Sequence, residues 1–103
     1  MNIKQYEIYW VDLNPTRGSE MKKNRPCVIV SPNDMNIYLD TVIIAPITSS
    51  NKGYPFRVSC NIGHIALDQL RTVDKTRFRD YIQTLSSVNI MEVKHVLNEM
   101  LVE

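Results

Sequence analysis

Short apolar runs separated by turn-forming residues occupy most of the chain from Tyr6 to Leu85. The runs are rich in β-branched and aromatic residues, which is the pattern of β-strands. We expect strands at residues 6–13, 27–30, 41–45, 54–60, 64–67, 69–73 and 81–85. The run at 41–45 is almost wholly apolar, which predicts a strand buried on both faces. Residues 33–40 indicate a turn or a single helical turn, and residues 48–53 a loop.

Only the C-terminal segment has the spacing of an amphipathic helix. Ser86 or Ser87 is its expected N-cap. Short strands with one terminal helix predict the α+β class, mostly β, built as a small, strongly bent sheet or barrel with the helix packed at its edge. The apolar stripe of the helix consists of Ile90, Val93, Val96, Leu97, Met100 and Leu101, opposite Glu92, Lys94, Asn98 and Glu99.

The composition is that of an ordinary globular protein. The 103 residues suffice for one small domain, spanning 1–103, and are too few for two. Twelve basic and eleven acidic residues give a net charge of +1, so bulk charge neither demands nor excludes a polyanionic partner. No stretch approaches the roughly 20 apolar residues of a membrane span, and no signal peptide is recognisable. We therefore expect a cytoplasmic protein that does not enter a membrane.

The cysteines and histidines do not indicate a metal site. Cys27 and Cys60 lie in apolar, strand-like runs, and in a reducing compartment they are expected to be core thiols. Together with His64 and His95 they show no recognisable ligand spacing. We expect no metal and no other cofactor.

A basic loop precedes the second predicted strand. Four basic residues and one acid give it a net charge of +3: Arg17, Lys22, Lys23 and Arg25 against Glu20. Such a loop suits a phosphate ligand, although a charge run by itself is more often a solvated surface. A second cluster, Arg71, Lys75, Arg77 and Arg79 against Asp74, also sums to +3, and the same alternative applies.

Two strand-end residues are the best candidates for chemistry. Arg25 adjoins Pro26 at the mouth of a buried strand, so its backbone is held while its planar guanidinium can face a phosphate. Thr48 leaves the other buried strand and reaches the same space if the two strands are neighbours. The alternative for Thr48 is a local turn hydrogen bond.

Several unlinked segments resemble the MazF/PemK (Kid) family of toxins, and together they cover nearly the whole chain. They are residues 8–15 with Gly18-Ser19-Glu20, Arg25-Pro26 with 28–30, and the segments 46–48, 52–56 and 67–74. The resemblance implies an SH3-like small barrel of the CcdB/PemK kind with a C-terminal helix. It also implies a homodimer that cuts single-stranded RNA without a metal and is neutralised by a cognate antitoxin.

The resemblance further implies which residues act. It places an essential arginine at Arg25 and an essential threonine at Thr48, and it makes Asp68 an acidic position that serves in catalysis in some members. Those members carry an arginine two residues before that aspartate, where this chain has Ala66. The expected catalytic residues are Arg25, Thr48 and Glu20, and the expected RNA contacts are Arg17, Ser19, Lys22, Lys23, Lys52, Tyr54, Asp68, Gln69 and Arg71.

The chemistry expected is attack of the RNA 2′-hydroxyl on the adjacent phosphorus, leaving a 2′,3′-cyclic phosphate. Arg25 would stabilise the phosphoryl charge, Thr48 would hydrogen-bond a non-bridging oxygen, and Glu20 would accept the 2′ proton. Tyr54, Phe56 and Tyr38 are possible stacking platforms for bases, with core packing favoured for Phe56.

Two other functions stay open. One is a gyrase-poisoning toxin of the CcdB type, but such toxins carry a tryptophan near the C-terminus, and the only tryptophan here is Trp10. The other is a catalytically inactive RNA-binding domain of the same fold.

Overall fold

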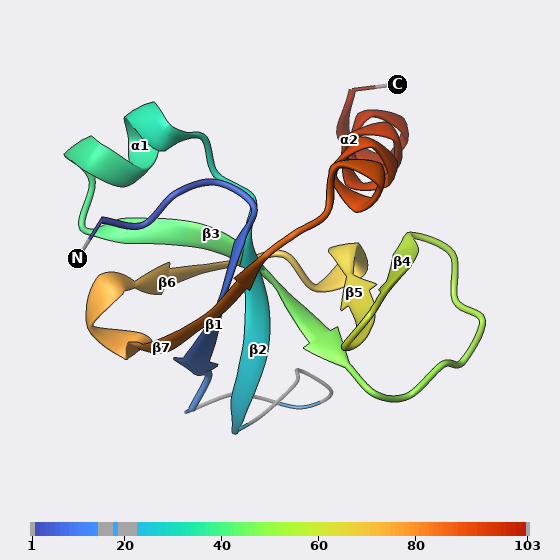
Figure 1. Ribbon diagram of the computed structural model, residues 1–103, viewed down its shortest axis with the longest axis horizontal. Coiled ribbons are helices and arrows are strands. Elements are labelled where there is room, and N and C mark those ends of the chain that lie inside the picture. The colour runs from blue at the N-terminus through green and yellow to red at the C-terminus, as the bar shows by residue number, and fades with distance from the viewer. Residues whose placement is uncertain (1, 15–17, 19–22, 103) are drawn as a thin grey trace.

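The computed structural model describes residues 2–14, 18 and 23–102. Within them, seven antiparallel strands form a sheet of order β4-β5-β3-β2-β1-β7, with β6 paired to β3 beside this path (Figure 1). The strands are β1 (Glu7–Asp12), β2 (Asn24–Ile29), β3 (Thr41–Thr48), β4 (Arg57–Cys60), β5 (Gly63–Ala66), β6 (Arg71–Asp74) and β7 (Phe78–Thr84). The helices are α1 (Asn33–Tyr38) and α2 (Ser87–Leu101), with 3-10 turns η1 (Leu67–Gln69) and η2 (Lys75–Arg77).

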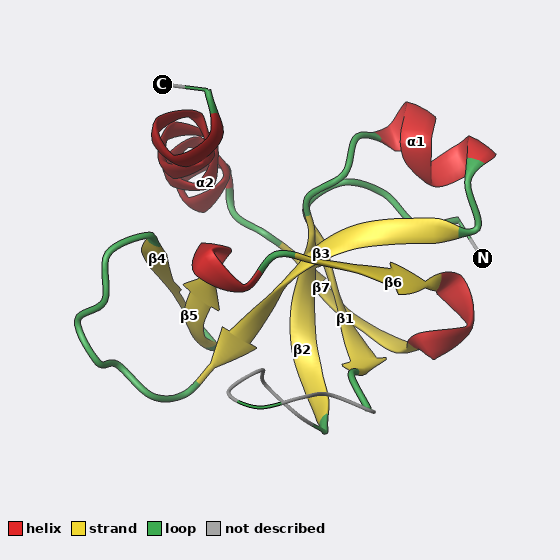
Figure 2. Ribbon diagram, turned by 180° about the vertical axis from the view of Figure 1, so that it is seen from behind, coloured by secondary structure: helices red, strands yellow, loops and turns green. Residues whose placement is uncertain are grey.

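β3 joins the β4–β5 hairpin to the rest of the sheet. It pairs with β6 along residues 41–44 and with β5 at residues 47 and 48, while β2 lies on its other side. Figure 2 shows β3 running from the β6 side to the β5 side of the molecule. The mostly β architecture with a C-terminal helix is the one predicted, and this bent sheet is compatible with an SH3-like barrel.

Alternating side chains divide the core into two clusters. Ile8, Val28 and Ala45 point to the cluster that α2 covers with its one fully buried residue, Val93. Their neighbours in the strands pack into a second cluster on the other side of the sheet. Ser86 caps α2 by accepting a hydrogen bond from the Asn89 amide, as predicted. The predicted stripe is wrong at its end, because Leu101 is exposed.

Two of the strand boundaries that differ from prediction do so for local reasons. β3 continues through Pro46 to Thr48, because Pro46 falls between the β6 and β5 pairings, a position where a strand tolerates a residue without an N–H. β4 begins at Arg57 instead of Tyr54. Phe56 has a φ of 64°, a left-handed conformation that interrupts a strand, and its exposure of 41% contradicts the core packing expected for it.

The two cysteines are unpaired thiols. Cys27 is fully buried, as predicted, whereas Cys60 is half-buried at the edge of the cluster under α2. Across the described residues, no helix has the length and apolar character needed to span a lipid bilayer.

Candidate functional site

Arg25 and Thr48, the residues predicted to be catalytic, lie at the same end of neighbouring antiparallel strands. The register of β2 and β3 pairs Cys27 with Pro46. The pairing ends there, and beyond it the two strands diverge, with Arg25 and Thr48 each two residues past that last pair (Figure 1). Because successive side chains of a strand alternate, each of the two projects to the same side as its strand's residue in that pair. The two side chains therefore share one face.

Both residues are held by their surroundings. Arg25 pairs with Val11 of β1, so its backbone is fixed at the end of β2. The Thr48 side chain is buried, and its Oγ1 accepts a hydrogen bond from the Ser50 amide at 3.2 Å. This is the turn hydrogen bond that was the alternative for Thr48. A hydroxyl both accepts and donates, so the Thr48 O–H retains a donor for a second partner.

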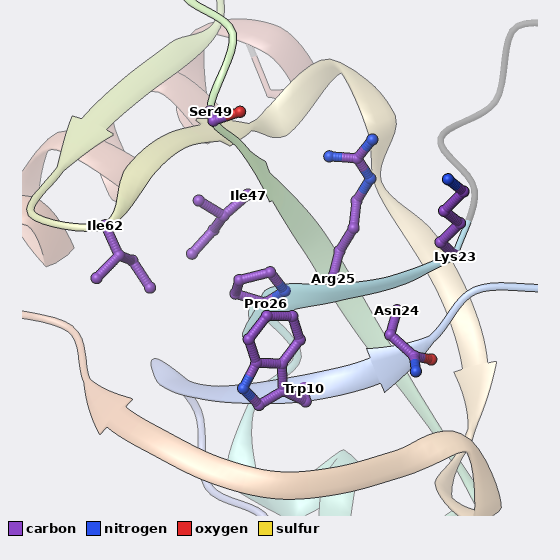
Figure 3. Close-up of a pocket in the computed structure, with 8 residues that line it drawn as sticks. All are labelled: Trp10, Lys23, Asn24, Arg25, Pro26, Ile47, Ser49 and Ile62. Atoms are coloured by element: carbon purple, nitrogen blue, oxygen red, sulfur yellow. The ribbon is translucent and has the colours of Figure 1, made fainter.

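A pocket of about 330 Å³ opens beside Arg25. Figure 3 shows the Arg25 side chain extending from β2 toward the region of Ser49, while Trp10 and Pro26 lie together on the opposite side. The pocket thus combines an apolar, aromatic surface with a cationic rim, which suits a ligand that has a flat ring and a phosphate. Its lining residues are Trp10, Lys23, Asn24, Arg25, Pro26, Ile47, Ser49 and Ile62.

A second arginine lies close to the same part of the sheet. Burial raises the pKa of the Cys27 thiol to about 12, and the charges of Arg25 and Arg71 act on the same thiol in the opposite direction. In the sheet, Arg71 pairs with Ile44 of β3, two residues before Pro46, the partner of Cys27. Arg71 Nη1 also donates a hydrogen bond of 2.8 Å to the carbonyl oxygen of Leu13. Arg71 thus anchors Leu13, the residue that follows β1, and adds positive charge to this part of the sheet.

Within the basic loop, the structure describes Gly18 and the residues at its two ends. Arg17, Ser19, Glu20 and Lys22 lie outside the described residues, so their predicted roles stay predictions. Lys23 is described, and it lines the pocket. The Lys23 amide donates to Asn14 Oδ1 and its carbonyl oxygen accepts from the Leu13 amide, so the two ends of the loop are joined beside Arg25.

The remaining predicted contacts lie on and around the β4–β5 hairpin. Lys52 and Tyr54 belong to the exposed segment that leads into β4. Asp68 and Gln69 belong to η1, directly after β5. Asp68 is bound by Arg57, whose Nε and Nη2 contact the two carboxylate oxygens at 2.6 and 3.1 Å.

This ion pair has further neighbours. The hydrogen bonds from Arg57 lower the pKa of Asp68 below its usual range, so the carboxylate is ionised at neutral pH. The Arg57 guanidinium also lies over the Tyr54 ring, 5.1 Å from its centroid. The structure therefore brings Tyr54 and Asp68 together through Arg57.

Sequence reasoning missed two residues of this region. Trp10 lines the pocket, and its exposure of 42% in a strand of mostly buried residues sets it apart only once burial is known. Arg57 was missed because its partner is eleven residues away, and only the pairing of Arg57 with Ala66 across β4 and β5 brings it near Asp68. No sequence signal identifies that register in advance.

The described part of the chain contains no group of three or more His, Cys, Asp and Glu side chains placed to hold a metal ion. The bent β-sheet with a cationic, partly aromatic pocket at its strand ends has the features of a small domain that binds a phosphate-bearing ligand.

Comparison with known proteins identifies the family. The profile of the PemK-like, MazF-like toxins of type II toxin–antitoxin systems matches residues 4–101. The Endoribonuclease MazF of Staphylococcus epidermidis is 35% identical over 106 residues, which cover 93% of this chain and 88% of the relative. The chain thus belongs to the PemK-like, MazF-like toxin family, as the sequence predicts.

Solved structures agree on the fold. The crystal structure of MazF from Deinococcus radiodurans superposes with a TM-score of 0.86 at 25% identity, covering 98% of this chain and 97% of that one. An endoribonuclease in complex with its cognate antitoxin, from a Mycobacterial species, gives a TM-score of 0.83 at 20% identity, covering 96% and 94%. The predicted fold class is therefore confirmed.

Proposed function

We propose that this chain is a sequence-specific toxin endoribonuclease that cleaves single-stranded messenger RNA without a metal ion. The observation that carries the proposal is the position of Arg25 on the rim of a partly aromatic pocket, at the end of β2 next to the end of β3 that carries Thr48. The endoribonuclease activity of a relative that matches nearly the whole chain supports the same reaction.

The reaction uses the nucleophile that RNA carries itself. The 2′-hydroxyl oxygen bonds to the adjacent phosphorus in line with the P–O5′ bond, which breaks. The products are a 2′,3′-cyclic phosphate and a 5′-hydroxyl, and the proton lost by the 2′-oxygen is balanced by one gained at the 5′-oxygen. Catalysis therefore needs alignment, a proton acceptor and a partner for the charge on the phosphoryl oxygens.

Arg25 and Thr48 supply the charge stabilisation. An arginine fork can donate two parallel hydrogen bonds to phosphoryl oxygens, and Thr48 adds its hydroxyl while Oγ1 stays fixed by the Ser50 amide. Arg71, whose charge acts on the same thiol as that of Arg25, increases the attraction for the backbone of the RNA. Glu20 is the proposed proton acceptor, in the basic loop that ends at Lys23.

The proposed partners follow from the family. The family consists of toxins of type II toxin–antitoxin systems, and one structural neighbour was solved with its cognate antitoxin. We therefore infer that this chain acts as a homodimer in the cytoplasm and is inhibited by a cognate antitoxin protein.

Sequencing of RNA ends tests the activity directly. Purified protein is incubated with a mixed RNA pool in buffer containing EDTA, and the new ends are mapped and assayed for cyclic phosphate. We expect cuts at one short motif with 2′,3′-cyclic phosphate ends. Arg25→Ala should lower the rate by at least a hundredfold, and Arg25→Lys should lose most of it because the fork is absent.

Lys94→Ala is the matched control, because it removes one exposed positive charge from α2. It should cut at the wild-type rate. Normal cutting by Arg25→Ala would reject the assignment. Stalled gyrase without cut RNA would favour the CcdB-type alternative, and binding without cutting would favour an inactive RNA-binding domain.

A further inference from the structure

The Arg57–Asp68 ion pair is built to hold a carboxylate in one orientation. Two hydrogen bonds from one guanidinium fix the carboxylate plane, and Gln69 Nε2 adds a third bond of 3.3 Å to Oδ2. A backbone amide hydrogen bond also acts on this carboxylate, so these contacts use most of the roughly four acceptor sites of the two oxygens. The Asp68 side chain is 30% exposed, whereas that of Arg57 is only 13% exposed. The carboxylate, and not the guanidinium, is the group that a ligand reaches.

A flat surface stands beside this carboxylate. Tyr54 is 52% exposed, and the Arg57 guanidinium lies over its ring. The segment between them is pinned, because the Phe56 carbonyl oxygen accepts a hydrogen bond from the Leu67 amide at the start of η1. The aromatic ring and the carboxylate therefore keep a constant relation, which is what selective contact with a nucleobase requires.

Ala66 explains how the arginine reaches its partner. Arg57 and Ala66 are paired across β4 and β5, where opposite Cβ atoms lie about 5 Å apart. The single methyl group of Ala66 leaves room for the Arg57 side chain to pass toward Asp68, two residues further along. A long side chain at position 66 would occupy that path.

The Arg57–Asp68 ion pair lies on the same face of the sheet as Thr48, one of the proposed catalytic residues. Thr48 pairs with His64, and His64 pairs with Ser59, so these residues form a row on one face. Arg57 precedes Ser59 by two residues in β4 and shares its face. Two strand spacings and two residue steps separate Arg57 from Thr48, roughly 12 Å between Cα atoms. One bound RNA strand can contact both places.

We propose that Asp68, Gln69 and Tyr54 form a base-reading subsite, in which Arg57 is the positioning residue that fixes the carboxylate. The subsite selects a nucleobase with an exocyclic amino group over uracil. An ionised carboxylate only accepts hydrogen bonds, so it pairs with an exocyclic amino group. Uracil offers it only the N3–H donor, which stands between two carbonyl oxygens that the carboxylate repels. This inference rests on the proposed RNA cleavage and adds a specificity determinant to it.

The test uses the RNA motif found by end mapping. Substrates carrying each of the four bases at every position around the cut are assayed with wild-type protein and the variants Asp68→Asn, Arg57→Ala and Arg57→Lys, with Lys94→Ala as the control. We expect one position where the wild type prefers an amino-bearing base over uracil by tenfold or more. At that position alone, Asp68→Asn and Arg57→Ala should reduce the preference to about two- to threefold.

The position-specific readout separates reading from general damage. Arg57→Lys keeps the charge but loses the two-bond fork, so it should also relax the preference while the products retain cyclic phosphate ends. Tyr54→Phe should keep the preference, and Tyr54→Ala should raise KM for all substrates because stacking is lost. Thermal unfolding followed by circular dichroism shows whether each variant is folded. If Arg57→Ala is not folded, the result for Asp68→Asn alone decides whether the base-reading subsite exists.

Two outcomes are distinguishable failures. If wild-type protein cuts RNA and the variants slow all substrates equally, or leave the preference unchanged, the base-reading subsite is rejected and the cleavage proposal stands. If wild-type protein cuts no RNA, the cleavage proposal fails. Fluorescence anisotropy with uncut oligonucleotides then tests the subsite alone, and equal affinity for amino-bearing and uracil sequences rejects it.

Discussion

Gly63 lies against Thr48 so closely that no side chain fits between them. A Cβ on Gly63 would be 2.7 Å from the Thr48 carbonyl oxygen and 2.8 Å from Cγ2 of Ile47. The φ of Gly63 is +148°, a conformation that residues with a side chain rarely adopt. The glycine therefore lets β5 approach the end of β3, where the proposed catalytic threonine stands.

Gly63→Ala should lower both stability and cleavage. The new methyl group must displace the backbone at Thr48, which costs about 2 kcal/mol or more in unfolding free energy and should slow cleavage at least tenfold. Gly53→Ala is the matched control, because Gly53 also has positive φ but a Cβ there meets nothing within 4 Å. It should cost about 1 kcal/mol and leave the rate within twofold. Urea unfolding and RNA cleavage measure the two effects, and equal losses in both variants would refute the contact as the cause.

The buried thiol next to Arg25 should be unreactive in the folded protein. Burial raises the pKa of Cys27 to about 12 from 9.0, so at pH 8 the thiolate fraction falls roughly a thousandfold. A thiol with a raised pKa adds stability that is complete below about pH 9 and is lost as the pH rises toward 12. In the Cys60→Ser variant, Ellman's reagent at pH 8 should label Cys27 only as fast as the protein unfolds. Complete labelling within minutes under native conditions would contradict this.

The sequence pattern predicted those elements whose buried side is marked by regularly spaced apolar residues. The alternation through Ile8 and the apolar runs near Val28 and Ile44 gave β1, β2 and β3, and the stripe around Val93 gave α2, because each buries one face. The neighbour relation of β2 and β3 was a condition in the sequence argument, and only the structure supplied it.

What the pattern did not predict depends on long-range pairing. Arg57 meets Asp68 through a hairpin register, and Arg71 meets Leu13 from a distant strand. The second basic cluster is another example, because Arg71 and Arg77 donate hydrogen bonds to carbonyl oxygens at the end of β1. The sequence shows only that four basic residues lie close together along the chain. Which carbonyl oxygens these side chains bind depends on the fold.

Arg77 should be a structural residue that supports the basic loop. Its Nη1 donates to the carbonyl oxygens of Asp12 and Asn14, at the point where β1 ends. Arg77→Ala leaves these carbonyl groups without that donor and should lower the unfolding free energy by about 1–3 kcal/mol. Arg79→Ala removes an exposed ion pair with Asp12 at 3.8 Å and two hydrogen bonds to the nearby carbonyl oxygens of Thr76 and Phe78. These contacts lie at the surface, and the loss should cost less than about 1 kcal/mol. Urea unfolding compares them, and equal midpoints would show that the Arg77 contacts contribute nothing.

Trp10 should report RNA binding in the pocket, because it is the only tryptophan of the chain and shares the pocket with Arg25. An RNA with a 2′-deoxy sugar at the cut lacks the nucleophile, so it binds without being cleaved. Titration with this RNA should change the tryptophan fluorescence, and the affinity should fall as salt rises, with a slope of about −0.7 per phosphate contact. Arg25→Ala should reduce that slope by about one contact.

Replacement of Trp10 shows whether this side chain contributes to RNA binding or only reports it by its fluorescence. Trp10→Phe keeps an aromatic surface next to Pro26, its partner in the β1–β2 pairing, and should bind within a fewfold of wild type. Trp10→Ala removes the surface, and stacking of one base is worth about 1–3 kcal/mol, so the affinity measured by anisotropy should fall roughly 5- to 150-fold. If anisotropy shows binding while Trp10 fluorescence stays constant and Trp10→Ala binds normally, the RNA does not occupy this pocket. In that case Arg25 would have to contact the phosphate from outside it, and the base next to the scissile bond would be unstacked.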